Sequence, residues 1–487
     1  MFLQAKVTWG ALALLGSAGL AQAEVHAEAQ HVAAEPSAAI TYCFAVLLVA
    51  MILSLALEEK IHAKKSLIVA LYAVVALIAG SAMGLMPFGS VTLPGGHLIE
   101  MPVYIPAVDW GVIAIILGSS IFVDVTSRSG LFTWIAVRLT KASGGDPRKL
   151  LWYYGLMTVV FSAVLNNVTA MIIVGSLTGV SLGKLGRENK LLAFLLVEGL
   201  LTNIGGLLTL ISSVPNIIIG NAASISFVQF FITASPYVAV ATVATILLGA
   251  RLFDIRALAT AEERAEAQTL VEAFDENDGI ESPFFFKFAT VMLLLFILTI
   301  AMTSALPVIS DLGMGFVALA FATAMLIRYK SDVDQFYKAI DWDLIIFFMS
   351  LFVVINVMEH ARVLGLIGQG IGLLIGDGES SMGTGVLLLT AAFFSSVTDN
   401  IPLAAMLAKI LSASGTPADS PLWWSVVFGA NLGGNITPIG SASTLVAVTL
   451  IHKYKLPLSF AGFVGKALPY AALQLGLAVI YVLVFVA

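Results

Sequence analysis

The sequence predicts an all-α polytopic membrane protein made of two inverted repeats, each with a re-entrant helical hairpin and a discontinuous helix. Of its 487 residues, 59% are hydrophobic and 11% are charged, which is about half the charge of a soluble protein. Apolar runs of about twenty residues recur along the chain, the length that crosses a hydrocarbon core of about 30 Å. Duplicated polar segments interrupt these runs at an offset of about 230 residues.

The N-terminus has the pattern of a secretory signal. Lys6 precedes a short apolar stretch, 7–20, which ends in Ala21-Gln22-Ala23. A charged start, an apolar centre and a small-residue end are typical of a cleaved signal peptide. We therefore expect a signal peptide over residues 1–23 and an exported mature N-terminus; an uncleaved first helix is the alternative. Residues 24–104 would then form a polar tail and two lead transmembrane helices.

One duplicated segment is rich in glycine and hydroxyl side chains. Asn203-Ile-Gly-Gly-Leu-Leu-Thr-Leu-Ile-Ser-Ser-Val-Pro-Asn216 recurs as Asn431-Leu-Gly-Gly-Asn-Ile-Thr-Pro-Ile-Gly-Ser-Ala-Ser-Thr444, with six of fourteen positions identical at an offset of 228. Backbone that leaves a helix at membrane depth must be buried in protein or line a water-filled cavity. Each copy therefore predicts a discontinuous helix, and a pair of such helices is typical of the substrate site of a secondary transporter.

The second duplicated segment predicts the hairpins. Phe161-Ser-Ala-Val-Leu-Asn-Asn167 recurs as Phe394-Ser-Ser-Val-Thr-Asp-Asn400 at an offset of 233. Basic residues flank 151–180 on both sides, so both of its ends are expected in the cytoplasm. That segment would enter the membrane and turn back at Asn166-Asn167, and its counterpart, 383–411, would turn at Asp399-Asn400.

The distribution of basic residues sets the orientation. With Lys6 in the signal peptide set aside, only Arg362 and Lys409 of the 24 Lys and Arg residues fall outside, as the positive-inside rule requires. Trp110 then opens its helix outside, whereas Trp342, 232 residues later, opens its helix inside. The repeats are therefore inverted. The predicted divisions after the lead helices are a first repeat (105–250), a cytoplasmic linker (251–285), linking transmembrane helices (286–341) and a second repeat (342–487).

Two carboxylates are candidates for ion coupling. Ionisable side chains at membrane depth are costly, so a function is their default interpretation. Asp399, at a hairpin tip, could exchange a proton for a cation, or it could cap the backbone of the hairpin. Glu198 lies five residues before Asn203; a proton carrier and a hydrogen-bond donor between helices are both open.

Polar residues of the duplicated segments offer hard oxygen ligands, although small polar residues also serve helix packing. The candidate ligands of a substrate or ion are Asn166, Asn167, Thr169, Asn203, Thr209, Ser212, Ser213, Asn216, Asn400, Asn431, Thr437, Ser441, Ser443 and Thr444. A Na⁺ site is predicted among Asn167, Asn203, Asp399, Asn400 and Asn431. The hydroxyls at the start of each half-helix could instead bind an anion through the helix dipole. Na⁺ and H⁺ would be transported coupling ions, and no cofactor is expected.

These motifs resemble the ion transporter superfamily over about 105–487. Thr398-Asp-Asn-Ile-Pro402 and Gly433-Gly-Asn-Ile-Thr-Pro-Ile-Gly-Ser441 look most like the branch of arsenite permeases, bacterial sodium/proton antiporters and the P protein, which has a citrate-transporter-like domain. The resemblance implies a scaffold, a mobile transport domain, a homodimer and elevator-type alternating access. Where that branch has Gly-Asp-Pro-Pro-Asn, this chain has Ser212-Ser-Val-Pro-Asn216, which replaces an acidic ligand with hydroxyls.

The predicted function is an ion-coupled secondary transporter of the inner membrane, foremost a sodium (cation)/proton antiporter. The alternatives are a sodium-coupled importer of a small anion (dicarboxylate, citrate or sulfate) and an arsenite efflux permease. No Gly-x-x-x-x-Gly-Lys loop for an ATP-driven pump and no His-Glu-x-x-His motif for a metalloprotease is present. The expected partners are the lipid bilayer, a small inorganic ion or small anion, and a second copy of the chain, with no nucleic acid.

Overall fold

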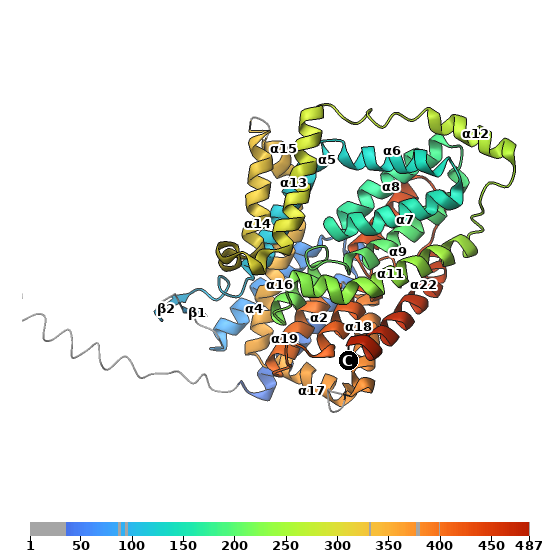
Figure 1. The fold of residues 1–487 in the computed structure, drawn as a ribbon. Coiled ribbons are helices and arrows are strands. Elements are labelled where there is room, and N and C mark those ends of the chain that lie inside the picture. The colour runs from blue at the N-terminus through green and yellow to red at the C-terminus, as the bar shows by residue number, and fades with distance from the viewer. Residues whose placement is uncertain are drawn as a thin grey trace, which may run out of the picture.

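The computed structural model describes residues 36–85, 89–92, 96–330, 333–375, 380–398 and 400–486. Eight helices within this part of the chain are long and apolar enough to cross a membrane, which confirms the predicted all-α polytopic class (Figure 1). The predicted signal peptide and the tip residue Asp399 lie outside the described residues.

The lead segment also contains a short antiparallel strand pair that the sequence pattern did not predict. Gly89 pairs with Met101 at the open end of this ribbon. The elements of the lead segment are α2 (Ala38–Ala56), α3 (Glu58–Ile61), α4 (Lys65–Ala82), β1 (Gly89–Thr92) and β2 (Leu98–Met101).

The remaining helices follow one order twice. The first set is α5 (Trp110–Ser127), α6 (Leu131–Ser143), α7 (Pro147–Val164), α8 (Asn167–Lys184), η1 (Glu188–Lys190), α9 (Leu191–Gly206), α10 (Val214–Ala222) and α11 (Phe227–Leu252). The second set is α16 (Trp342–His360), α17 (Val363–Ile375), α18 (Ser381–Val397), α19 (Asn400–Ala413), α20 (Pro421–Gly433), α21 (Ala442–Lys453), α22 (Phe460–Tyr481) and η3 (Val482–Val486). Between the sets lie α12 (Ala261–Glu272), α13 (Pro283–Ala301), η2 (Thr303–Ala305), α14 (Pro307–Ile327) and α15 (Val333–Ala339).

The first helix of each set begins in the same way. Asp109 accepts a hydrogen bond from Val112 N at 3.1 Å, and Asp341 accepts one from Leu344 N at 3.0 Å. Each carboxylate thereby satisfies a backbone donor that has no partner within its own helix. The indole N–H of the tryptophan that follows each cap donates to a carbonyl five residues upstream, at 3.2 Å for Trp110 and 3.1 Å for Trp342. The two repeats therefore share individual hydrogen bonds as well as the order of their helices.

Both predicted helical interruptions are present in each set. The hairpin α7–α8 turns between Val164 and Asn167, and α18–α19 turns between Val397 and Asn400. The other interruption separates α9 from α10 after Gly206, and α20 from α21 after Gly433. Each predicted discontinuous helix is thus two half-helices joined by an irregular turn.

Each hairpin packs closely on the broken helix of its own set. A Cβ at Gly205 would lie 2.6 Å from Val159 O, and a Cβ at Gly433 would likewise clash with the backbone of Ala392. Beside these contacts, Ser162 Oγ donates to Thr202 O at 2.7 Å. Ser395, its counterpart, donates to Ala430 O at 2.6 Å. Glycine lets the helices approach, and a serine hydroxyl joins them, as in other membrane helix pairs.

The two sets run in opposite directions. In Figure 1, α6 crosses the upper end of the molecule and α17 crosses the lower end. α6 connects α5 to the first hairpin, and α17 connects α16 to the second hairpin, so equivalent connections lie at opposite ends. The inverted orientation inferred from the basic residues is therefore present in the fold.

The linker between the sets lies against α6. A Cβ at Gly145, just after α6, would lie 2.9 Å from the Ala267 Cβ of α12. Asp146 caps α7 through Lys149 N at 2.9 Å and also accepts from Leu258 N of the linker at 2.9 Å. A hydrogen bond from Lys141 holds the pKa of the Glu276 carboxyl below its ordinary value.

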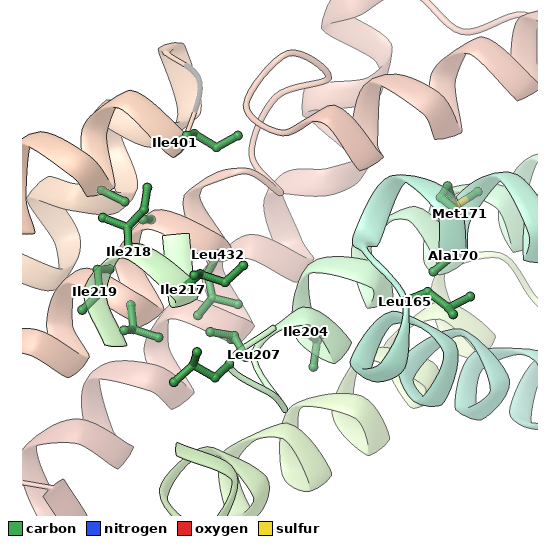
Figure 2. Packing of buried hydrophobic residues seen from close by; sticks show 14 of the residues in the cluster. Leu165, Ala170, Met171, Ile204, Leu207, Ile217, Ile218, Ile219, Ile401 and Leu432 are labelled. Carbon is green, nitrogen blue, oxygen red and sulfur yellow. The ribbon is translucent and has the colours of Figure 1, made fainter. Parts of the chain in front are cut away.

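The core surrounds the broken helices. Figure 2 shows Ile204, Leu207, Ile217 and Leu432 next to the breaks, and all four are buried. Apolar packing on every side leaves few partners for a polar group in this region, so the polar side chains must bond to one another or to freed backbone.

Candidate functional site

Asn203 lies at the centre of a buried cluster of amides and hydroxyls. Its Nδ2 donates to Ser441 Oγ at 2.9 Å and to Asn435 Oδ1 at 2.8 Å. Its Oδ1 accepts from Ser443 Oγ at 3.0 Å and from Asn167 Nδ2 at 3.3 Å. One side chain thus joins the first hairpin tip to the break of the opposite repeat.

Asn431, the repeat counterpart of Asn203, makes the reciprocal contacts. Its Oδ1 accepts from Ser213 Oγ at 2.7 Å, and its Nδ2 donates to Asn216 Oδ1 at 2.9 Å. Ser213 and Ser441 are also counterparts, at the same offset of 228 residues. Each broken helix therefore sends its asparagine to the serine of the other, which is the exchange expected of two units related by an approximate two-fold axis.

A second group of predicted ligands closes the breaks. Asn216 Nδ2 donates to Gly206 O at 2.7 Å and to Thr209 O at 2.9 Å, and Ser212 Oγ donates to Gly206 O at 2.6 Å. The Thr444 hydroxyl is within donating distance of two carbonyl oxygens, that of Ser441 at 2.8 Å and that of Gly434 at 3.3 Å. These side chains satisfy carbonyls that the interrupted helix leaves without partners.

Two threonines attach the breaks to the hairpins. Thr209 Oγ1 donates to Ala163 O at 2.5 Å, and Thr437 Oγ1 donates to Ser396 O at 2.5 Å. Their hydroxyl protons are directed to backbone. The two threonines thereby hold the hairpin tips over the broken helices.

A cavity of about 410 Å³ lies between α5 and α16 on one side and the hairpins and breaks on the other. Both hairpin tips reach it. Its polar lining residues are Ser120, Asn166, Asn167, Thr169, Asn203, Ser212, Ser213, Asp341, Asn400, Ser441 and Ser443. Among the described lining residues none is Lys, Arg or His. Asn431, expected at the same cavity, lies behind Ser213 and is not part of the lining.

A second cavity, of about 530 Å³, is related to the first by the repeat. Asp109 lines it, as Asp341 lines the first, and the two aspartates cap helices that start at opposite faces. Its other polar lining residues are Asn221, Asn356, Glu359, Lys409 and Ser412. The central amides do not line it. The cluster around Asn203 is thus reached from the side of Asp341.

Glu198 lies away from the cavity lining. Its side chain is completely buried, and its Oε1 accepts a hydrogen bond from Thr178 Oγ1 at 2.7 Å. Lys409, predicted at the outer end of its hairpin, lies 3.1 Å from Glu359 and pairs with it. Glu198 accepts the hydrogen bond from Thr178 between α8 and α9, whereas the sequence suggests a donor, and its role as a proton carrier stays a prediction.

Sequence reasoning missed the amides that extend the cluster outward. Asn435 Nδ2 donates to Gln474 Oε1 at 2.8 Å, and Gln474 Nε2 donates to Thr245 Oγ1 at 3.0 Å. This series of hydrogen bonds runs from the second break through α22 to α11. Asn435 stands inside the duplicated segment but has Leu207 as its counterpart, so the repeat comparison did not select it. Gln474, an amide within the apolar run of α22, was a signal that could have been used.

Comparisons with known proteins identify the family. A model of the citrate transporter family matches residues 61–429. The 46 kDa membrane protein of Mycobacterium leprae is 30% identical over 381 residues, which cover 77% of this chain and 86% of the relative. The arsenical pump membrane protein of Escherichia coli is 24% identical over 373 residues, which cover 75% of this chain and 83% of that protein.

Solved structures show the same fold. The YdaH transporter of Alcanivorax borkumensis aligns with a TM-score of 0.57 at 13% identity, covering 87% of this chain and 98% of that one. The resemblance that the hairpin and break motifs indicated is confirmed by the family match and by the arsenical pump relative. The chain belongs to the citrate transporter family of the ion transporter superfamily and is a multi-pass membrane transporter.

Proposed function

We propose that this protein is a sodium (cation)/proton antiporter of the inner membrane, working as a homodimer by elevator-type alternating access. The observation that carries the proposal is the chemistry of the cavity. Amide and hydroxyl oxygens converge there from both repeats, and the described lining residues include no basic side chain. Side-chain and unwound-backbone oxygens in discontinuous helices suit a hard monovalent cation.

The coupling step would use two acidic residues, Asp399 and Glu198. Asp399 directly precedes Asn400, whose side chain lines the cavity. A carboxylate there would bind either a proton or a cation but not both, and this competition is the basis of exchange. Glu198 would hold or relay a proton beside the cluster. Asn167, Asn203 and Asn400 would supply neutral oxygens to the cation.

The pair of repeat-related cavities supports alternating access. Asn167 and Asn203 line the cavity on the Asp341 side, and neither lines the cavity on the Asp109 side. A rigid displacement of the hairpins and breaks against α5 and α16 would bring the central amides to the cavity on the Asp109 side instead. Such a motion is possible because inverted repeats can adopt each other's arrangement.

A second candidate is sodium-coupled import of a small anion. The citrate transporter family match favours it, and so do the half-helices α10 and α21, whose N-cap residues, Ser213 and Ser441, line the cavity. The N-terminus of a helix attracts anionic groups. Arsenite efflux is a third substrate class, suggested by the arsenical pump relative.

Flux measurements in proteoliposomes separate these candidates. A pH-sensitive dye inside the vesicles would be followed after addition of Na⁺, Li⁺, K⁺, arsenite or dicarboxylates in turn. We expect a dye response to monovalent cations in the absence of any organic anion. Na⁺-dependent uptake of a labelled dicarboxylate without a cation-driven dye response would replace the antiporter with the importer.

A further inference from the structure

A buried acidic side chain stands apart from both cavities. Glu198 is completely buried on α9, and one of its oxygens, Oε2, has no hydrogen-bond partner among the described residues. Its other oxygen has a single donor, the Thr178 hydroxyl. No Lys, Arg or His forms an ion pair with it in the part of the chain that the structure describes. An ionised carboxylate in this setting would be costly, so the surroundings favour the neutral, protonated side chain.

A line of buried hydroxyls lies between Glu198 and the end of α6. Tyr154 OH lies 2.7 Å from Ser181 Oγ and 2.9 Å from Thr140 Oγ1. Thr178 and Ser181 are three residues apart on α8 and therefore lie on one face, about 4.5 Å apart along the axis. A hydroxyl group can both donate and accept a hydrogen bond. We call Thr178, Ser181, Tyr154 and Thr140 the hydroxyl line.

The hydroxyl line belongs to the first repeat alone. The counterparts of Tyr154, Thr178 and Glu198 in the second repeat are Leu387, Leu411 and Val426. Leu387 and Val426 are buried apolar residues of α18 and α20. The helix ends next to the hydroxyl line, those of α6 and α8, face the side of the linker (Figure 1). A path of this kind would therefore serve the cytoplasmic face only.

The surroundings of Glu198 contain few other titratable groups. Tyr154 of α7 is close enough to interact with it electrostatically. The hydroxyl of Tyr454, after α21, lies against Gly179 of α8, and Tyr470 of α22 lies against Gly249 of α11, next to Val197. The cations on these elements lie in the first or last turns of their helices (Arg148, Lys149, Lys184, Lys190, Arg251 and Lys453) or in the second turn of α22 (Lys466), and His452 bonds to Leu458 O.

We propose that Glu198 is a proton-binding site that exchanges its proton with the cytoplasm through the hydroxyl line; this rests on the proposed function only for the use of that proton in coupling. During loading, a proton from the cytoplasmic side passes to Thr140, which is itself buried near the end of α6. Each hydroxyl passes its own proton forward and keeps the one it receives, and the last proton forms the acid on Glu198. The step from Ser181 to Thr178 runs along one face of α8, where the two residues are about one turn apart. No redox step occurs, and release is the reverse.

The proton on Glu198 would act on the transport site through α9. Asn203 follows five residues later, about 7.5 Å along the helix axis, and Asn203 is the centre of the amide cluster. A negative charge created at that depth, in a low-dielectric core, would favour a cation at the cavity. Proton release at Glu198 and cation binding near Asn203 would thereby be linked.

Infrared difference spectroscopy on the purified full-length protein tests the site without any transport assay. We expect the carbonyl stretch of a protonated carboxyl at neutral pH, its loss in Glu198→Gln, and a frequency shift in Thr178→Val, which removes the hydrogen bond. After a pH jump, Tyr154→Phe should slow the loss of this band about tenfold or more. Thr158→Val is the matched control, because that buried hydroxyl on the same helix donates to Tyr154 O and lies outside the hydroxyl line.

The outcomes are distinguishable from those of the flux experiment. An ionised Glu198 at neutral pH, or a Tyr154→Phe variant that responds as fast as the native protein, would overturn the inference. An intact Glu198 band that titrates through the hydroxyl line, in a protein without cation-driven flux, would support the proton site and refute the antiporter. Loss of the band in Thr158→Val as well would show that the assay reports packing, and the assignment would then fail.

Discussion

Single polar residues in this transporter bond either to the freed backbone of the helix breaks or to side chains of the opposite repeat. Asn216, Ser212 and Thr209 direct their donors to backbone carbonyls. Asn203 instead bonds side chains of the opposite repeat and lines the cavity. Both kinds occur within one fourteen-residue segment, so the role of each follows from its partner and not from its residue type.

The paired asparagines give a test at this scale. Asn203→Ala and Asn431→Ala each leave buried partners without a hydrogen bond, and we expect each to reduce the free energy of unfolding by about 1–3 kcal/mol. Asn203 lines the cavity, whereas Asn431 does not. Flux titrations should therefore show a raised KM for the cation in Asn203→Ala and a nearly native KM in Asn431→Ala. Equal KM values in the two variants would contradict the placement of the site.

Asp399 gives the test that separates the two leading functions. Asp399→Asn keeps the shape of the side chain but removes its titration, so we expect cation/proton exchange to be lost. In an anion importer the new amide would still offer an oxygen, and uptake would need more Na⁺ without being abolished. Dye-based exchange and labelled-anion uptake would both be measured, with membrane insertion and size-exclusion profile as controls. Full exchange by correctly inserted Asp399→Asn protein would refute the carboxylate mechanism.

At the scale of elements, each hairpin and its broken helix form one packed unit. The unit depends on a glycine against backbone and on a serine that donates across the contact, and both features occur in both repeats. The same contacts hold each hairpin tip over the break of its own repeat. Both repeats therefore position their cavity-lining residues in the same way.

Substitution of these glycines tests that contact. Gly205→Ala and Gly433→Ala would place a methyl group against the hairpin backbone, and we expect each to lower the free energy of unfolding by about 1–3 kcal/mol. Gly476→Ala in α22 is the control, because a Cβ there meets nothing within 4 Å. Thermal unfolding in detergent would be compared. A control as destabilised as the other two would show that the loss is not due to the contact.

At the scale of the whole molecule, the inverted repeats and the linker define two faces. The linker with α12 lies at the α6 end, and α17 lies at the other (Figure 1). Asp341 lines one of the two cavities and Asp109 lines the other. The fold allows a motion in which each repeat takes up the arrangement of the other.

Labelling of introduced cysteines tests the orientation. Cys43, the only cysteine in the sequence, would first be replaced by serine. We expect a cysteine at Gln268, exposed on α12, to react with an impermeant maleimide only from the cytoplasm. A cysteine at Asp419, exposed before α20, should react only from outside. Labelling of both from the same side would contradict the inverted arrangement.

The amino-acid sequence by itself determined the class of fold, the repeat, the hairpins and the broken helices. These follow from local properties: apolar length, glycine and asparagine within apolar runs, and the positions of basic residues. The bilayer makes such signals reliable, because unsatisfied backbone in lipid is too costly for irregular structure to occur by chance. The short β1–β2 ribbon was not predicted, because it lies in the loop between two spans, where that constraint does not apply.

Only the tertiary structure decided which polar residue bonds to which. Amides and hydroxyls are interchangeable donors and acceptors, so their partners depend on how helices from opposite repeats cross. Asn431 was expected at the cavity but bonds Ser213 behind its wall, while Asn435 and Gln474 joined the cluster without a repeat signal. The pairing of Glu198 with Thr178, on a neighbouring helix, has the same origin. Hydrophobic burial specifies the helices, and the geometry of their contacts specifies the site.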